Sequence, residues 1–149
     1  MTTNDVIHTL RHGGLRVRTA LWLLPPEQLA SLPDSAARLG IHLADVRQPL
    51  LNTVAPDQRF LHLTVREFLE ALDALCQNPQ TSDCLLVVNC DLIIARLNFQ
   101  ERREAWDTLY RGLPHRSHAL LIAMPDNADL LLPSEQELTY WRNEGRLVP

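Results

Sequence analysis

The stretch LLVVNCD, residues 85–91, decides the fold. Four consecutive apolar residues followed by polar ones are typical of a strand that is buried on both faces and ends at a polar edge. Strands of this kind belong to parallel sheets that helices cover on both sides. The stretch therefore predicts an α/β fold in which residues 89–91 lie at the carboxyl end of a buried strand, where open α/β sheets bind ligands.

Segments of strand and helix character alternate outward from this stretch. Apolar runs predict strands at 19–24, 41–46, 84–89 and 118–124, and 146–148 adds a short fifth strand. Three helix starts carry capping-box spacing, in which two side chains bond each other's free backbone N–H groups: Thr64 with Glu67, Asn98 with Glu101, and Ser134 with Glu137. The alternation predicts a single α/β domain over residues 1–149. We expect a three-layer sandwich with a four- or five-stranded, mainly parallel sheet.

Helices are also expected at 5–11 and 27–39. The second is expected to break at Pro33-Asp34, where Asp34 caps a second short turn. The segment that contains Pro49 and Pro56 is expected to be a loop. The predicted core consists of Leu21, Leu23, Leu43, Phe68, Leu72, Leu86, Val88, Trp106, Leu120 and Ile122.

Composition closes several function classes. All fourteen Lys and Arg positions are arginine, so every mechanism that needs a catalytic lysine is excluded. The net charge of −4 argues against a general nucleic-acid coat. Three cysteines without a Cys-x-x-Cys pair predict buried, reduced thiols in a cytoplasmic protein, with no zinc site. We see no secretion signal and no apolar run that approaches the roughly 20 residues of a membrane span.

The order of strands and helices resembles the AAA-type P-loop core. Residues 85–94 are similar to its metal-binding strand, and residues 118–125 to the strand that follows. The chemistry of that core is missing, because Pro25-Pro26 and Glu27 stand where the phosphate loop should follow the first strand, and Asn89 replaces the metal-binding acid.

Proteins of this size and shape are similar to small accessory subunits of BREX-type phage-defence operons. The resemblance implies a pseudo-ATPase, a non-catalytic adaptor or assembly subunit that works without a cofactor. Its expected partner is another protein or a second copy of the chain.

The strand end at Asn89, Cys90 and Asp91 has two interpretations. It is a residual nucleotide pocket or a thiol activated beside Asp91, or it is a simple turn in which Asp91 caps backbone and Cys90 packs as a small hydrophobe. Asp45 ends another predicted strand, so Asp45 and Asp91 together suggest an alternative function, a metal-dependent nuclease or phosphohydrolase using Mg²⁺.

Basic residues gather in two segments. Arg111, His115, Arg116 and His118 suggest an anion- or nucleic-acid-contacting loop, or else a solvated loop. Arg11, His12, Arg16 and Arg18 form a second cluster, for which a charged helix end is the simpler explanation. Together they raise the third hypothesis, a nucleic-acid-binding module.

The last predicted helix suggests a partner interface. Tyr140 and Trp141 are adjacent, and adjacent helical positions point about 100° apart, so both cannot face one core. We expect an exposed aromatic and arginine patch within residues 130–146, with Tyr140, Trp141 and Arg142 as anchors. A leucine among 130–132 is also expected to be exposed.

Overall fold

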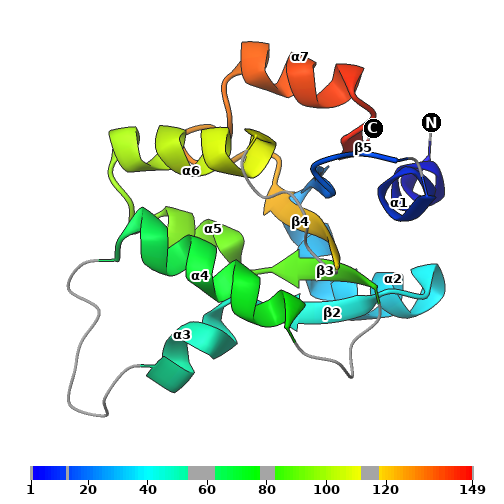
Figure 1. Ribbon diagram of the computed structural model, residues 1–149, viewed down its shortest axis with the longest axis horizontal. Coiled ribbons are helices and arrows are strands. Elements are labelled where there is room, and N and C mark those ends of the chain that lie inside the picture. The colour runs from blue at the N-terminus through cyan, green and yellow to red at the C-terminus, as the bar shows by residue number, and fades with distance from the viewer. Residues whose placement is uncertain (1, 13, 54–62, 78–82, 112–117, 149) are drawn as a thin grey trace.

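The structure, a computed structural model, describes residues 2–12, 14–53, 63–77, 83–111 and 118–148. Its centre is a five-stranded, all-parallel sheet in the order β2-β3-β4-β1-β5 (Figure 1). The strands are β1 Thr19–Leu24, β2 His42–Asp45, β3 Cys84–Val88, β4 Ala119–Pro125 and β5 Leu147–Val148. The helices are α1 Thr3–His12, η1 Pro26–Ser31, α2 Leu32–Leu39, α3 Arg47–Thr53, α4 Val65–Cys76, α5 Cys90–Ile94, α6 Phe99–Arg111 and α7 Glu135–Asn143.

Helices cover both faces of the sheet, which confirms the predicted three-layer α/β sandwich (Figure 1). One apolar cluster joins α1 and α2 to one face through residues such as Leu10, Leu32 and Leu86. A larger cluster joins α4, α5, α6 and α7 to the other face through residues such as Phe68 and Trp106. Neighbouring strand residues point to opposite faces, so the all-apolar strands contribute to both clusters.

Strand β1 occupies a switch point of the sheet. It pairs with β4 on one side, from Thr19 opposite Leu120 to Leu24 opposite Pro125, and with β5 on the other. The connection after β1 leads to β2 at one edge of the sheet, whereas the connection after β4 leads to β5 at the opposite edge. The carboxyl ends of strands beside such a reversal are where open α/β sheets offer room for ligands.

The helix caps predicted at Thr64, Asn98 and Ser134 are present. The Thr64 hydroxyl accepts a hydrogen bond from the Glu67 backbone N–H, and the Glu67 carboxylate accepts one from the Thr64 backbone N–H. Asn98 and Glu101 form the same reciprocal pair at the start of α6. The Ser134 hydroxyl accepts from the backbone N–H of Glu137 at the start of α7. These caps satisfy backbone donors that a helix start otherwise leaves unpaired.

Three segment predictions were wrong. Residues 47–53 form helix α3 and not a loop, because Pro49 lies in the first helical turn, where its missing N–H has no helical partner to lose. The segment after β1 changes from η1 to α2 at Leu32, so Pro33 lies at the start of α2, and Asp34 lies in its first turn rather than at the cap. Helix α5 follows β3 directly and was not expected.

The core prediction holds at seven of its ten positions. The exceptions are Leu23, Leu43 and Val88, which are only partly buried. Leu43 lies on β2, an edge strand, and the other two lie at or near the carboxyl ends of their strands.

Candidate functional site

The carboxyl ends of β2 and β3 are joined by a hydrogen-bonded cluster. The Asn89 side-chain amide donates to Asp45 Oδ2 at 2.9 Å. Arg47 donates to the same carboxylate from its backbone N–H at 2.9 Å and from its guanidinium at 2.9–3.2 Å. Asn89 has a left-handed backbone with φ of 68°, the one positive φ of a non-glycine residue in the described ranges. This conformation turns the chain from β3 straight into α5.

The charged and polar groups of this cluster pair with one another. Burial alone would raise the pKa of Asp45, but the hydrogen bonds from Arg47 and Asn89 hold that pKa below its usual 3.8. Both carboxylate oxygens are engaged, and a guanidinium already supplies the positive charge that a metal ion would bring. Within the described ranges, no three His, Cys, Asp or Glu side chains gather as a metal site. The cluster therefore offers the predicted Asp45 and Asp91 metal pair no support.

Cys90 lies under this turn and is fully buried. Burial raises the pKa of its thiol, and the nearby carboxylates of Asp91 and Asp45 raise it further. A neutral thiol without solvent access is a poor nucleophile, so the geometry favours packing over the activated-thiol interpretation. Cys76 and Cys84 are likewise buried, and all three cysteines are reduced thiols outside any disulfide, as predicted.

The carboxyl end of β1 has no phosphate-binding loop. The chain passes from Leu24 through Pro25 into η1, and the backbone N–H of Asp126 donates to the carbonyl of Leu24 at 2.8 Å. A hollow of about 500 Å³ lies nearby, between the start of α1 and α2, with Trp22 among its lining. Arg38 is the one charged side chain that lines it, and it donates to the Ser35 hydroxyl at 3.1 Å.

The two predicted basic segments meet in space. Arg16 donates from its guanidinium to the backbone carbonyl of Arg111 at 3.0 Å. Acidic partners occupy two of the arginines: Arg11 lies 3.0 Å from Asp83, and Arg111 lies 3.1 Å from Asp107. Much of this charge is therefore already compensated.

Other members of these basic segments are poorly placed to contact an anion. Arg18 donates to the backbone carbonyl of Leu10 at 2.8 Å, and His118 is buried immediately before β4. His115 and Arg116 lie outside the described residues.

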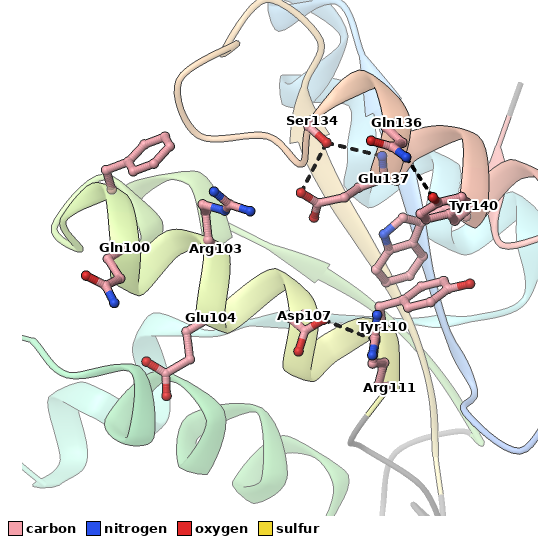
Figure 2. Close-up of a pocket in the computed structure, with 12 residues that line it drawn as sticks. Gln100, Arg103, Glu104, Asp107, Tyr110, Arg111, Ser134, Gln136, Glu137 and Tyr140 are labelled. Carbon is pink, nitrogen blue, oxygen red and sulfur yellow. Dashed lines mark hydrogen bonds and ion pairs between the residues drawn. The ribbon is translucent and has the colours of Figure 1, made fainter.

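A groove of about 880 Å³ lies between α6 and α7 (Figure 2). Phe99, Arg103, Asp107 and Tyr110 line it from α6, and Ser134, Glu137, Tyr140 and Trp141 line it from α7 and its cap. A second hollow of about 320 Å³ continues it past the loop before α7 and shares Phe99, Arg103, Ser134 and Glu137 with it. The two hollows form one continuous surface, which we call the α6–α7 groove.

Exposed apolar side chains concentrate at the α6–α7 groove. Four large apolar residues are exposed in the described ranges: Leu130 at 83%, Phe99 at 70%, Leu92 at 47% and Tyr140 at 45%. All of them except Leu92 line the groove. Scattered exposed apolar residues need no explanation, but a cluster of them around one concavity is typical of an interaction surface.

The floor of the groove is a rigid aromatic and arginine cluster. The Trp141 ring is buried and meets the Tyr110 ring edge-on, with 5.4 Å between the centroids. Beneath them, the guanidinium of Arg146 lies 4.4 Å from the Trp141 centroid and 4.9 Å from the Tyr110 centroid. Arg146 is 3% exposed. Such cation–π contacts strengthen when the cation is removed from water.

Arg146 also ties three elements together through hydrogen bonds. It donates to the carbonyl of Thr19 at 2.7 Å, to that of Tyr110 at 3.1 Å and to that of Leu109 at 3.3 Å. The last two are carbonyls of the final turn of α6, which otherwise lack helical partners. Burial lowers the pKa of Arg146, and an ion pair with Glu144 at 2.7 Å counteracts that effect. Arg146 thereby links the end of α6, the start of β1 and the segment that follows α7.

The three predicted interface residues differ in exposure, as expected for consecutive positions on a helix. Tyr140 and Arg142 are exposed, whereas Trp141 is buried in the floor. Tyr140 lines the groove, and Arg142 does not. Sequence reasoning missed Phe99 and Arg103. Phe99 lies seven residues before Trp106, nearly on the same side of a helix, so periodicity gave no sign that Phe99 would be exposed.

Comparisons of this chain with protein-family models, characterised proteins and solved structures find no match. None of the helices in the described ranges combines the length and the apolar character that crossing a bilayer requires.

Proposed function

We propose that the protein is a non-catalytic adaptor or assembly subunit that binds a protein partner through the α6–α7 groove. The observation that carries this proposal is the gathering of Phe99, Leu130 and Tyr140 around one concavity on a rigid floor. Exposed aromatic side chains that ring a groove lose water-exposed apolar area when a partner covers them.

The carboxyl ends of the strands support the same proposal. The turn after β1 lacks the glycine-rich cradle and the lysine that bind nucleotide phosphates in P-loop proteins. At the turn after β3, the Asn89 side-chain amide donates a hydrogen bond to the Asp45 carboxylate, so these two polar groups are already paired within the fold. These features favour a domain that works by contact. The resemblance to BREX-type accessory subunits would make another product of the same operon the partner.

The test compares groove variants with a matched surface variant. A Phe99→Ala, Tyr140→Ala double variant removes two groove side chains, and Leu92→Ala removes an exposed apolar side chain elsewhere. A partner is recovered from the native host with the tagged wild-type chain, identified by mass spectrometry, purified and titrated by calorimetry. We expect the double variant to bind it at least about tenfold more weakly and Leu92→Ala to bind it normally. Equal binding by all three proteins rejects the groove as the docking surface.

A second measurement tests the absence of catalysis. Calorimetry with ATP and Mg²⁺ is expected to show no binding and no turnover. Tight binding with turnover that Asp91→Ala abolishes would instead establish the metal-dependent alternative and reject the adaptor.

A further inference from the structure

One cation of the α6–α7 groove, Arg103, has no ion-pair partner among the described residues. Arg103 lines both hollows and so stands where they join. Its guanidinium lies 5.8 Å from the centroid of the Phe99 ring. No carboxylate in the described ranges lies within ion-pair distance of it. Arg103 is therefore an exposed cation beside an exposed aromatic ring, which is a pairing that interfaces use to hold an acidic side chain.

Several other charged side chains of the groove are held by neighbours or point away from α7, whereas Asp129 lines the second hollow. Asp107 pairs with Arg111 one turn further along α6. The Glu137 carboxylate accepts a hydrogen bond from the Ser134 hydroxyl at 3.1 Å, at the cap of α7. Glu104 leaves the helix about 100° away from Arg103 and extends away from α7 (Figure 2). Arg103, by contrast, extends toward α7 (Figure 2).

The groove residues that α6 contributes lie in one stripe along that helix. Phe99, Arg103 and Tyr110 fall at relative positions 0, 4 and 11 of α6, which form one stripe along its surface. At 1.5 Å per residue, the distance along the axis from Phe99 to Tyr110 is about 16 Å, and that from Phe99 to Arg103 is about 6 Å. A partner helix lying along α6 would cover the same length with two apolar anchors eleven residues apart.

We infer that the α6–α7 groove binds an amphipathic helix of a partner protein, with an acidic residue of that helix paired to Arg103. The inference rests on the proposed function and specifies the chemistry of the partner. One anchor lies against Phe99 and Leu130, and the other against Tyr110 and Tyr140. If the partner helix runs parallel to α6, its N-terminal anchor lies against Phe99, and the acidic residue follows that anchor by four positions. If it runs antiparallel, its N-terminal anchor lies against Tyr110, and the acidic residue follows that anchor by seven positions. An alanine-rich helix with these three features is the smallest ligand that the groove should accept.

The test uses synthetic helices. Each probe is a fluorescein-labelled, end-blocked peptide of alanine and glutamine with leucine at positions 3 and 14. Glutamate stands at position 7 in one peptide and at position 10 in another, and lysine replaces that glutamate in two matched peptides. Fluorescence anisotropy is expected to show that one glutamate peptide binds the wild-type protein at least about tenfold more tightly than its lysine match. Arg103→Glu should invert that order, and Arg142→Glu, an identical charge change outside the groove, should preserve it.

Three outcomes would overturn the inference. The first is that no peptide binds, and the second is that the preference for glutamate survives Arg103→Glu. The third is a dimer of the chain itself in sedimentation whose dissociation constant changes with Arg103→Glu, because the groove would then belong to a second copy. The proposed function fails separately, when Phe99→Ala with Tyr140→Ala leaves the purified partner bound.

Discussion

The turn after β3 and the α6–α7 groove both combine polar and apolar side chains, but they differ in how those side chains are satisfied. At the turn, Asp45 accepts hydrogen bonds from both Asn89 and Arg47, and Cys90 is sealed beneath. In the groove, the Arg103 guanidinium lies near the Phe99 ring and pairs with no carboxylate in the described ranges, and Phe99 is largely exposed. A polar cluster that satisfies itself stabilises the fold. A surface that leaves a cation and aromatic rings without protein cover is available to a partner.

The largest effect is expected where the groove rests on buried polar contacts. Arg146→Met removes the donor to the carbonyls of Thr19, Leu109 and Tyr110. Orphaned buried acceptors are expensive, so we expect the free energy of unfolding to fall by about 3–5 kcal/mol. Urea denaturation of Arg146→Met beside Arg142→Met, an exposed arginine on α7, measures this difference. A loss below about 1 kcal/mol would mean that the groove floor does not depend on Arg146.

A smaller loss is expected at the turn itself. Asn89→Ala places a residue with no local hydrogen bond in a left-handed conformation and also removes the donor to Asp45. We expect it to lower the free energy of unfolding by about 2 kcal/mol. Asn89→Gly loses the same hydrogen bond without the backbone cost, so it should lose about 1 kcal/mol less than the alanine variant. Equal losses in denaturant titrations would show that the backbone conformation is not strained.

The charge of Asp45 should have a modest effect that depends on pH. Its folded pKa is lowered, so its ionised form stabilises the fold above the unfolded value of 3.8, and that contribution disappears as pH falls through the folded pKa. The carboxylate is partly exposed and screened by solvent, so Asp45→Asn should cost only about 0.5 kcal/mol at pH 7. Unfolding curves of the two proteins should converge below pH 3.8. A difference that persists in stronger acid would assign the effect to packing.

The smallest effect on stability is expected in the groove. Phe99→Ser and Leu130→Ser change side chains that are largely exposed, so the free energy of unfolding should change by no more than about 0.5 kcal/mol. Thermal unfolding of the two single variants checks this. A loss above about 1.5 kcal/mol in either would make the groove part of the fold's own core and would weaken its assignment as a docking surface.

The sequence predicted the layers well because their signals are local. The apolar run at Thr19–Leu24 has the bounds that were expected, and the capping boxes at Thr64 and Asn98 mark where α4 and α6 begin. A strand that is apolar on both faces and a cap with its acid three residues on need only neighbours along the chain to be recognised.

The groove could not be predicted in the same way because its walls come from two helices. One of the adjacent residues Tyr140 and Trp141 was expected to be exposed, and Tyr140 is the exposed one. Phe99 gave no such sign, and Arg103 is one arginine among fourteen. Its lack of an acidic partner depends on where Asp107 and Glu137 lie in space. Arg146 was likewise hidden, because its contacts with Thr19 and Leu109 join distant parts of the chain.

The place of β1 in the sheet has a consequence for the growing polypeptide. This strand is made well before both of its neighbours, β4 and β5. A nascent chain therefore emerges from the ribosome with the apolar run of β1 and no strand to pair with it. Sheets whose paired strands are far apart in the sequence form slowly, and they expose aggregation-prone apolar surface until they form. We expect the newly synthesised protein to depend on chaperones until β4 has been made, and β1 to be among the last strands to pair.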